Sequence, residues 1–561
     1  MQNPLVQIRD LRVTFGRNEV VHGLSFDIFP NEIIGIVGES GSGKSVTSLA
    51  LMGLLPSSAS VRGTVVFDTF DLLSQTSKQW RKLRGNDIAM IFQEPMSSLN
   101  PSMRCGVQVA EILGVHTQMP KSEIKKEVLS LFEKVKLPNP QRIFESYPHQ
   151  LSGGQKQRVM IAMAIACKPK LLIADEPTTA LDVSVQNEIL SLLKELQKET
   201  AMSILFISHD LGVVSQIAHR VLVMYRGDLV EQGSSERVFR HPEQLYTQAL
   251  LASKPSTKIR LKRLPTIDDF VGNKVAAEAE TTKQRIVKHA RIYTKEPLLH
   301  VKNVTKTYVS SSGLLAKNQS FKAIDTVSLT LYEGETLGLV GESGCGKTTL
   351  GKMIAKLTGT DSGQIFYKGK DITHLNRSET KQLRKDIQII FQDPYSSLNP
   401  KMKVGEAVTE PMTVHGMYAN AAERKAKTLE IFEKVGLSPE HFDRYPHEFS
   451  GGQRQRIGIA RAIALQPKII ICDESVSALD ISVQAQVLNL LNELKDNYGF
   501  SYIFISHDLS VVKYMSDRIA VMQKGNIEEI AEADDLYRHP KSGYTRSLIA
   551  VFDQLNNVRS V

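Results

Sequence analysis

At 561 residues, the chain is too long for one hydrophobic core, so we expect at least two domains. Apolar residues make up 42% of the sequence and charged residues 23%, and no apolar run approaches the roughly 18 residues of a membrane helix. The net charge is +9, and residues 254–296 carry six of these charges because they hold 11 basic and 5 acidic residues. So local an excess fits a basic linker near an anionic membrane face better than a nucleic-acid groove, and we expect no nucleic-acid partner.

The N-terminal sequence and the cysteines argue against further classes of protein. The polar start, MQNPLVQIRD, has no apolar signal-peptide core, so we expect the chain to stay in the cytosol. The cysteines show no CxxC spacing, which argues against a zinc site, an iron–sulfur cluster or a disulfide framework. They are Cys105, Cys167, Cys345 and Cys472.

The sequence contains the same series of motifs twice. GESGSGKS at residues 38–45 returns as GESGCGKT at residues 341–348. FQEPMSSLNP or FQDPYSSLNP, LSGGQ or FSGGQ, an apolar stretch ending in Asp-Glu, and SHDL follow in the same order. The second copy has an insertion at about Ser310–Ser320. We therefore place domain 1 at residues 1–253, a flexible or partly helical linker at 254–296, and domain 2 at 297–561.

Short apolar runs alternate with amphipathic helical stretches in both copies. Such alternation is typical of an α/β fold with buried parallel strands. The predicted strands are Ile33–Val37, Leu171–Ala174, Ile204–Ile207, Leu337–Val340, Ile469–Cys472 and Ile503–Ile505. Helical patterns follow the strands, for example at Val185–Leu196, and the residues between Pro95 and Pro148 predict a helical insertion.

The two glycine-rich segments match the phosphate-loop pattern GxxxxGK[ST], each between a predicted strand and a predicted helix. Glycines allow backbone N–H groups to surround phosphate oxygens. We expect Lys44 and Lys347 to reach the nucleotide phosphates, and Ser45 and Thr348 to offer a hydroxyl to Mg²⁺. The other loop residues expected to contact nucleotide are Gly38, Gly41, Ser42, Gly43, Gly341, Gly344, Cys345 and Gly346.

Asp175-Glu176 and Asp473-Glu474 end apolar strands in the two copies. Because adjacent side chains at a strand end diverge, the aspartate can serve Mg²⁺ while the glutamate faces an attacking water. We assign the glutamates as general bases or water-orienting groups.

Two further polar positions recur beside these carboxylates. Gln93 and Gln392 follow apolar runs, and their neutral amides can touch Mg²⁺ and water together. His209 and His507, within ISHDL, can hydrogen-bond the γ-phosphate and the glutamate. Alone, a loop glutamine or a single histidine is more often structural, and the repeated order supports the functional interpretation.

The SGGQ segments open predicted helices at Gln155–Ala166 and Gln453–Ala464. A helix start with glycines and a serine hydroxyl can bind an anion. Because each domain already has a phosphate loop, we expect this second site to contact the γ-phosphate held by the other domain. Its residues are Ser152, Gly154, Gln155, Ser450, Gly452 and Gln453.

These motifs together resemble the ATP-binding cassette (ABC) ATPases over nearly all of both halves. The resemblance implies two tandem P-loop domains, each with a helical subdomain, and ATP with Mg²⁺ as ligands. Ala180-Leu181-Asp182 and Ala478-Leu479-Asp480 match the family's D-loop. Phe15 and Tyr308 lie where the family stacks an aromatic ring on adenine, although Phe15 could equally belong to the core.

FQEPMSSLNP, YPHQLSGGQ, HPEQLYTQALL and their counterparts resemble the oligopeptide/dipeptide permease ATPases in particular. The fused form is similar to YejF-type ATPases of peptide and microcin C importers and to glutathione-importer ATPases. The resemblance implies a head-to-tail pair, in which Lys44 works with Ser450 and Gly452, and Lys347 with Ser152 and Gly154. It also implies two membrane permease subunits, an external substrate-binding protein, and a place on the cytoplasmic face of the bacterial inner membrane.

The chain departs from the family at two places. Many relatives carry a cysteine cluster after the HP…YT segment, and this chain carries none there. Ser475-Val476 replace Pro177-Thr178 after the catalytic glutamate; without the rigid proline, the second site could hydrolyse ATP more slowly.

Alternative functions remain at this stage. A soluble tandem ATPase acting on ribosomes would also have a charged linker, although the HP…YT and SSLNP features oppose it. A DNA-repair ABC protein would need zinc-binding cysteine pairs, and a tandem sugar-importer ATPase would usually show one eroded site. The chemistry alone does not exclude an exporter, and the sequence does not reveal the cargo.

Overall fold

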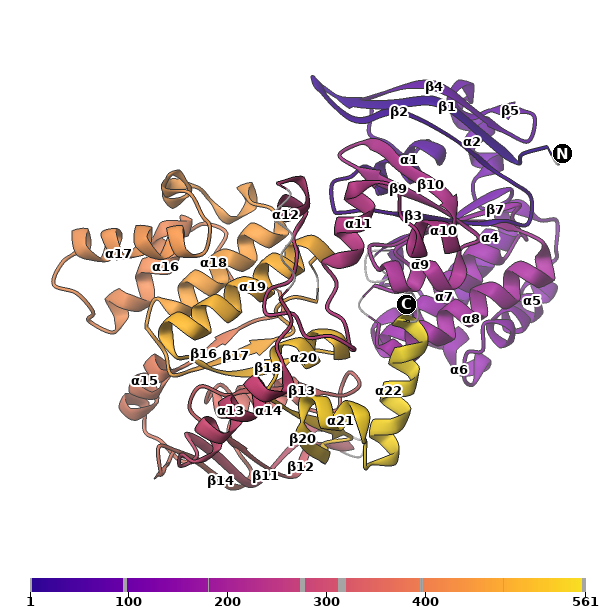
Figure 1. Cartoon of the computed structure of the whole chain (residues 1–561). Coiled ribbons are helices and arrows are strands. Elements are labelled where there is room, and N and C mark those ends of the chain that lie inside the picture. The colour runs from indigo at the N-terminus through magenta and orange to yellow at the C-terminus, as the bar shows by residue number, and fades with distance from the viewer. Residues whose placement is uncertain are drawn as a thin grey trace. The chain divides into compact units, whose positions relative to one another are not determined.

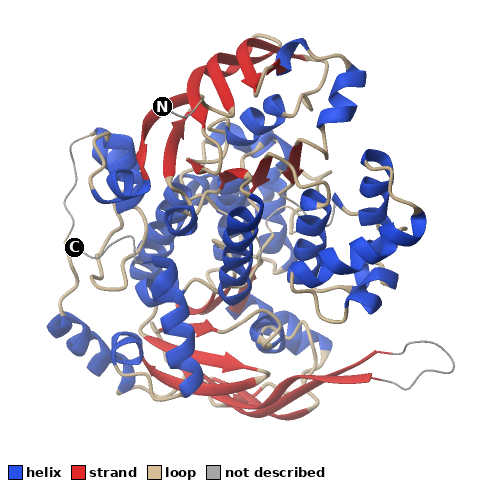
Figure 2. Ribbon diagram, turned by 90° about the vertical axis from the view of Figure 1, so that its right-hand side faces the viewer, coloured by secondary structure: helices blue, strands red, loops and turns tan. Residues whose placement is uncertain are grey.

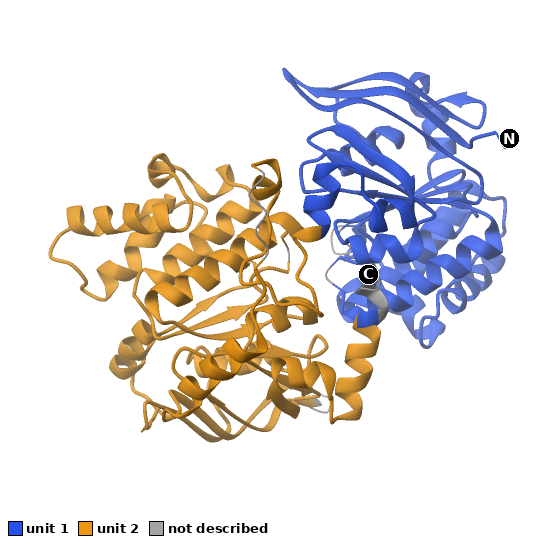
Figure 3. Ribbon diagram, in the orientation of Figure 1, with its two compact units in different colours: residues 1–251, 553–561 blue, residues 252–552 orange. Residues whose placement is uncertain are grey.

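The computed structural model describes residues 3–93, 98–179, 181–272, 278–310, 319–393, 395, 397–477 and 479–556. The D-loop residues Ala180 and Ala478 lie outside this part of the chain. The chain divides into two compact units (Figure 3), one formed by residues 1–251 and 553–561 and the other by residues 252–552.

A mixed six-stranded sheet forms the centre of unit 1, with the strand order β10-β9-β3-β8-β7-β6. Its strands are β3 (Ile33–Val37), β6 (Ile88–Ile91), β7 (Leu171–Asp175), β8 (Ser203–Ile207), β9 (Arg220–Tyr225) and β10 (Asp228–Ser234). All neighbours pair in parallel except β9 and β10. Every residue of β3, β7 and β8 is buried, which explains why these strands are continuous apolar runs.

A second, antiparallel sheet of unit 1 has the order β2-β1-β4-β5 and was not predicted from the sequence. Its strands are β1 (Val6–Phe15), β2 (Asn18–Ile28), β4 (Ala59–Phe67) and β5 (Phe70–Asp71). Helix α1 (Lys44–Leu51), which begins within the phosphate loop, contacts β1 and β2 as well as β7 of the central sheet. One apolar cluster, including Ile8, Val65, Leu51 and Ile173, joins both sheets and this helix, and it fixes the loop between them.

Helices account for the rest of unit 1 (Figure 1). The segment predicted as a helical insertion forms α4, α5 and α6, and α4 and α5 pack on α7, the helix that follows SGGQ. The helices are α2 (Ser77–Leu83), α4 (Cys105–His116), α5 (Lys121–Lys134), α6 (Pro140–Glu145), α7 (Gly153–Ile165), α8 (Val183–Thr200), α9 (Leu211–Ile217), α10 (Ser235–Arg240) and α11 (Leu245–Ala252).

Unit 2 repeats this architecture. Its central sheet has the order β16-β17-β18-β13-β19-β20, and its antiparallel sheet has the order β12-β11-β14-β15. The strands are β11 (Leu299–Ser310), β12 (Gln319–Leu331), β13 (Thr336–Val340), β14 (Ser362–Tyr367), β15 (Lys370–Asp371), β16 (Ile387–Ile390), β17 (Ile469–Asp473), β18 (Ser501–Ile505), β19 (Arg518–Gln523) and β20 (Asn526–Glu532). Strands β11 and β12 are longer than β1 and β2 and form the extended ribbon in Figure 2. Of the insertion at about residues 310–320, residues 311–318 lie outside the described chain.

The helices of unit 2 correspond to those of unit 1 in order and place. They are α14 (Lys347–Ile354), α15 (Arg377–Asp386), α16 (Val404–Val414), α17 (Ala421–Lys434), α18 (Gly451–Ile463), α19 (Ile481–Tyr498), α20 (Leu509–Met515), α21 (Ala533–Arg538) and α22 (Gly543–Asn556). No helix among the described residues is both long and apolar enough to cross a membrane.

The basic segment 254–296, which we expected to be flexible or partly helical, contains helices α12 (Ile267–Val271) and α13 (Thr282–Tyr293) and packs within unit 2. Leu264 is 1% exposed and belongs to an apolar cluster of this unit. The side-chain amide of Asn489 bonds both the N–H and the carbonyl of Leu264, at 2.9 Å each. Further along, in α13, the buried Arg285 pairs with Glu280, Glu532 and Asp534, so the segment is held by ion pairs as well as by apolar contacts.

Candidate functional site

The phosphate loop of unit 1 connects β3 to α1 and depends on glycine. Gly38 has a φ of 151°, and a Cβ at this position would lie 2.1 Å from the carbonyl oxygen of Met224. Gly43, with a φ of 98°, is the N-cap of α1, and no side chain caps this helix start. The backbone N–H groups of the first turn therefore remain available to an anion. Gly341 and Gly346 take the same conformations in unit 2.

The lysine of each loop turns back over the loop. Lys44 Nζ donates hydrogen bonds to the carbonyl oxygens of Gly38 at 2.8 Å and Glu39 at 2.7 Å. Lys347 Nζ does the same with Gly341 at 2.7 Å and Glu342 at 2.9 Å. Both lysines are buried, so each places a positive charge inside the loop.

A hydroxyl and an aspartate meet beside each loop. Ser45 Oγ donates to Asp175 Oδ1 at 3.2 Å, and Thr348 Oγ1 donates to Asp473 Oδ1 at 2.8 Å. Burial raises the pKa of both aspartates, and the hydroxyl hydrogen bonds oppose that rise. A hydroxyl oxygen with one carboxylate is a donor set suited to Mg²⁺, which prefers oxygen ligands and usually shares its coordination with substrate phosphates and water.

Glu176, which follows Asp175, adopts an unusual backbone conformation. Its φ is +49°, a value disfavoured for non-glycine residues, and its N–H donates to the Ile207 carbonyl at 2.9 Å. Gln93 Nε2 donates to Glu176 Oε2 at 2.9 Å, and His209 Nδ1 lies 3.1 Å from the same oxygen. Gln93 and His209 thus reach the glutamate from two different strand ends.

Unit 2 builds the same cluster around Glu474, which has a φ of +48°. Gln392 Nε2 donates to Glu474 Oε2 at 2.9 Å, and His507 Nδ1 lies 3.5 Å from that oxygen. In both units, the glutamate has a positive φ, accepts a hydrogen bond from a glutamine side chain and lies next to a histidine ring.

One contact distinguishes the two clusters, and sequence reasoning missed it. Thr179 Oγ1 donates to the Glu176 carboxylate at 2.9 Å, whereas Ser477 Oγ donates to the backbone carbonyl of Glu474 at 2.8 Å. Glu176 is therefore held by one more side-chain hydrogen bond than Glu474. A repeat alignment places Thr179 opposite Ser477, but only the backbone geometry shows where each hydroxyl points.

The glutamates and the second histidine have shifted pKa values. Burial raises the pKa of Glu176, but the hydrogen bond and charge of His209 outweigh it, and the net pKa is lowered. The same balance lowers the pKa of Glu474. Burial lowers the pKa of His507, and Glu474 reverses this to give a raised pKa. At neutral pH both glutamates are carboxylates that can accept a hydrogen bond from water.

The SGGQ segments form two capping boxes. Ser152 Oγ accepts from the N–H of Gln155 at 3.3 Å, and Gln155 Oε1 accepts from the N–H of Ser152 at 3.1 Å. Ser450 and Gln453 repeat this arrangement at 3.4 and 3.1 Å. A Cβ on Gly154 would lie 2.7 Å from Val185, and one on Gly452 would lie 2.4 Å from Val483, so both glycines permit close helix packing.

The two candidate adenine-stacking residues lie at the far ends of the first strands of the antiparallel sheets. Phe15 ends β1 and is partly buried against the apolar cluster of unit 1. Tyr308 is 44% exposed near the end of β11, with Lys306 Nζ 5.8 Å from its ring centre. Tyr308 is thus open to a stacking partner, whereas Phe15 shares its surface with the core.

A tyrosine outside the predicted site also contacts each loop. The hydroxyl of Tyr246, from α11, accepts from the N–H of Glu39 at 3.4 Å, and Tyr544 accepts from Glu342 at 3.3 Å. Both tyrosines belong to the HP…YT segments, which the sequence marked as a family feature but did not connect to the nucleotide site.

The loop geometry fits a bound nucleotide. Among the described residues, the buried Ser42 Oγ has no hydrogen-bond partner, as expected of a group that awaits a ligand. The uncapped start of α1 and the buried Lys44 offer donors and positive charge to phosphate at the same place.

Comparison with known proteins identifies the fold. A family model described as "ABC transporter" matches residues 21–179 and again residues 324–477, which together form more than half of the chain. The chain belongs to the ABC transporter family. Each match spans one phosphate loop and the Asp-Glu strand end that follows it. This ABC protein is an ATP-binding ATPase that powers transport.

Whole-chain relatives support this family assignment. The ABC chain is 46% identical over 560 residues to the "Glutathione import ATP-binding protein GsiA" of Pectobacterium atrosepticum, covering 97% of this chain and 89% of the relative. It is 45% identical over 566 residues to the protein of the same name from Escherichia coli strain K12, with the same coverage. A further model, "Oligopeptide/dipeptide transporter, C-terminal region", matches residues 230–279.

Solved ABC cassettes match one half at a time. A dimeric ATP-binding cassette in a post-hydrolysis state, bound to ADP and Pi, is 29% identical and covers 42% of this chain and 98% of its own, with a TM-score of 0.39.

Proposed function

We propose that the chain is the energy-coupling subunit of a peptide-class importer. The main support for this proposal is the match of residues 230–279 to the C-terminal region of oligopeptide/dipeptide transporters. The relatives are named as glutathione import proteins, which supports a small peptide as the kind of cargo carried by the importer. The cassette itself holds ATP rather than cargo, so it supplies energy and not specificity.

The structure supports a link between this C-terminal region and the nucleotide site. The matched region begins in β10 and includes α11, whose Tyr246 bonds the phosphate loop at Glu39. Glu231 Oε1 and Oε2 accept from the N–H groups of Glu243 and Gln244 at 2.9 and 3.2 Å, which fixes the turn before α11. A change in the position of this region could therefore reach the phosphate loop through the hydrogen bond between Tyr246 and Glu39.

In each cassette we assign the hydrolysis chemistry to one cluster. Ser45 and Asp175 hold Mg²⁺, which neutralises phosphate charge when it is bound. Glu176 accepts a hydrogen bond from the attacking water and orients it, while His209 fixes the glutamate and faces the γ-phosphate. The lowered pKa of Glu176 keeps it ionised, and this favours orientation of water over a complete proton transfer as its main contribution.

The second cassette uses Thr348, Asp473, Glu474 and His507 in the same roles. Because Glu474 lacks the extra hydroxyl contact that Thr179 gives Glu176, we propose that the second cluster hydrolyses ATP more slowly. The nucleotide at each phosphate loop is also contacted by the serine of the other cassette's SGGQ segment. Ser450 serves the loop of Lys44, and Ser152 serves the loop of Lys347. ATP then favours the closed pair and hydrolysis reverses this preference.

The proposed partners are two integral-membrane permease subunits and an external substrate-binding protein. The cassettes would sit on the cytoplasmic face of the bacterial inner membrane as peripheral subunits.

The test is purification of the Glu176→Gln, Glu474→Gln protein from detergent-solubilised membranes with ATP and Mg²⁺, followed by mass spectrometry. We expect two multi-span permease proteins to copurify with the chain. Identification of their substrate-binding protein would then indicate the cargo. Recovery of ribosomal proteins, with the chain absent from membranes, would overturn the importer proposal. Wild-type protein purified in parallel without nucleotide is the control.

A further inference from the structure

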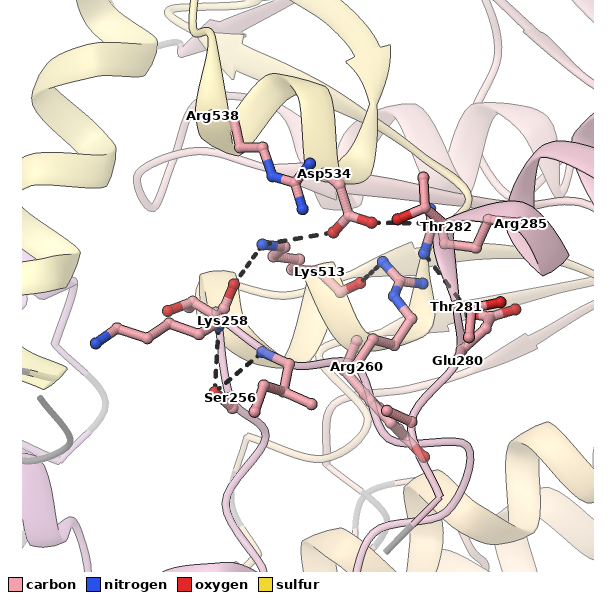
Figure 4. Close-up of a pocket in the computed structure, with 14 residues that line it drawn as sticks. Ser256, Lys258, Arg260, Glu280, Thr281, Thr282, Arg285, Lys513, Asp534 and Arg538 are labelled. Atoms are coloured by element: carbon pink, nitrogen blue, oxygen red, sulfur yellow. Dashed lines mark hydrogen bonds and ion pairs between the residues drawn. The ribbon is translucent and has the colours of Figure 1, made fainter. Parts of the chain in front are cut away.

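A pocket of about 370 Å³ lies within unit 2, where the basic segment meets helices α20 and α21. It is built from two stretches of that segment, Ser256–Arg260 and Ala279–Arg285, and from residues of the two helices (Figure 4). Its volume is in the range of small-molecule sites, roughly 300–1,000 Å³. None of the residues assigned to nucleotide lines it.

The pocket is strongly cationic. Five basic side chains line it against two carboxylates, and one further carboxylate, Glu532, lies behind Arg285. The basic residues are Lys258, Arg260, Arg285, Lys513 and Arg538. Positive charges therefore outnumber negative ones among the residues that line the pocket.

The two arginines of the basic segment retain unused donors. Arg260 donates from Nη1 to the Ser516 carbonyl at 2.9 Å and from Nη2 to the Lys513 carbonyl, while its buried Nε finds no hydrogen-bond partner among the described residues. Arg285 is 4% exposed. Within the same described part of the chain, its Nε and Nη1 make no hydrogen bond, although Asp534 and Glu280 lie 3.4 and 3.9 Å away as ion-pair partners. Buried donors without acceptors are costly unless a ligand satisfies them.

The remaining cations are crowded as well. Lys513 is 7% exposed and donates to the Thr257 carbonyl, with Asp534 at 3.4 Å. Burial lowers its pKa, and nearby Arg260 and Arg538 lower it further while Asp534 opposes them. No ion pair links Arg538 to a carboxylate within the described part of the chain, and its side chain extends toward Lys513 and Asp534 in Figure 4. An added anion would relieve this crowding.

Hydroxyl groups complete the lining. Ser256 and Thr282 line the same space, and Thr281 and Tyr514 also line it, although their hydroxyls donate to Gln284 and to the Lys262 carbonyl. Arginine forks with lysines and hydroxyls are the combination that recognises phosphate oxygens, because several donors converge on one multiply charged group.

We propose that this pocket binds a small phosphate-bearing anion with at least two negative charges. The ligand bridges the basic segment and the two helices by accepting from Arg260 and Arg285 on one side and from Lys513 and Arg538 on the other. This site is independent of the phosphate loops and of the importer assignment.

The probe is inorganic pyrophosphate, titrated by calorimetry into the full-length protein with ADP saturating both phosphate loops and no added Mg²⁺. We expect one binding event that Arg538→Glu weakens by about tenfold or more, since a charge-assisted bond becomes a repulsion. Arg538 is exposed, so its replacement should leave the fold intact. The matched control is Arg377→Glu, an equal charge change at an exposed position of α15 outside the pocket, and it should bind like wild type.

Four results would overturn the proposal. They are an absence of pyrophosphate binding to wild type, equal weakening by the Arg377 and Arg538 variants, binding that neither the Arg538 nor the Lys258 variant weakens, and tighter binding of citrate than of pyrophosphate, which would indicate a polycarboxylate site. Should the Arg538 variant melt at a lower temperature than wild type, Lys258→Glu, at another exposed position, supplies the same test. If neither variant weakens binding, the charged residues of the pocket serve only to hold the basic segment against α20 and α21.

Discussion

The hydroxyl of Tyr246 lies 3.4 Å from the backbone nitrogen of Glu39 and accepts its hydrogen bond. These residues are 207 positions apart, one in the C-terminal region of the first cassette and the other in its phosphate loop. The Tyr246 side chain is buried and its ring packs on Tyr225 with a centroid distance of 4.2 Å. A segment typical of the transporter subclass therefore supports the catalytic loop directly.

Removal of this hydroxyl should weaken ATP binding without unfolding the protein. In Tyr246→Phe, Tyr544→Phe we expect the KM for ATP to rise by about two- to tenfold and kcat to change little, because one neutral hydrogen bond contributes about 0.5–1.5 kcal/mol. Steady-state phosphate release measures both constants. Tyr225→Phe keeps the ring packing and the loop contact and should match wild type. An unchanged KM in the double variant would show that the contact does not support the loop.

Two glycines of the first loop should respond differently to alanine. A Cβ on Gly38 would lie 2.1 Å from the Met224 carbonyl, whereas one on Gly41 would meet nothing within 4 Å. We expect Gly38→Ala to abolish nucleotide binding at this loop and reduce the stoichiometry from two to one, as measured with a fluorescent ATP analogue. Gly41→Ala, with only the strain of its φ of 78°, about 1 kcal/mol, should still bind two. Equal behaviour of the two variants would contradict the crowding argument.

Asp517 should be essential to the stability of unit 2. It is 1% exposed and accepts from the Thr336 N–H at 2.9 Å, with Lys288 at 2.9 Å and Lys495 at 3.1 Å. Burial raises its pKa, but Lys495, His289 and Lys288 lower it well below the ordinary value. Its stabilisation is therefore present above the unfolded pKa of about 3.9 and is lost only as pH falls through the lower folded pKa.

We expect Asp517→Asn to lower the free energy of unfolding by about 3–5 kcal/mol, because it leaves Lys495 buried without its partner. Urea unfolding at neutral pH measures the change. Asp371→Asn, at an exposed position in the same unit, is the control and should change little. A loss below about 1 kcal/mol for the Asp517 variant would mean that the charges are effectively solvated.

His507 of the second cassette should have a pKa above its ordinary value. The Glu474 carboxylate raises the pKa of His507 against the opposing effect of burial. The pair's stabilisation is thus complete below the unfolded pKa of about 6.5 and disappears as pH rises through the higher folded pKa. NMR titration of ¹³C-labelled histidine should show a raised pKa that falls in Glu474→Gln. A wild-type pKa below the ordinary value would refute the pairing.

The central strands could be predicted from sequence because burial on both faces makes them unbroken apolar runs. Predicted strand Ile33–Val37 has the bounds of β3, while Leu171–Ala174 ends one residue before β7 does, since polar Asp175 still pairs with Ile207. The antiparallel sheet was missed because its strands alternate buried and exposed residues with bulges, as between Ile8 and Leu11. Short local patterns cannot show such irregular pairing.

Site chemistry was more predictable than site geometry. The motifs nominate Glu176 and Gln93, but the left-handed backbone at Glu176 and the Thr179 contact depend on how the strand end turns. In the basic segment, composition predicted a flexible or partly helical linker. Its partners lie far along the chain, as Glu532 does at 247 residues from Arg285, and they follow no local pattern.

The most direct test of the account is phosphate release by the Glu176→Gln, Glu474→Gln protein under saturating ATP and Mg²⁺, beside wild type and each single variant. We expect the double variant to bind ATP normally and to lose hydrolysis by about 100-fold or more, since the water-orienting carboxylates are gone from both clusters. Release near the wild-type rate by the double variant would remove the two glutamates from their assigned role and contradict the mechanism.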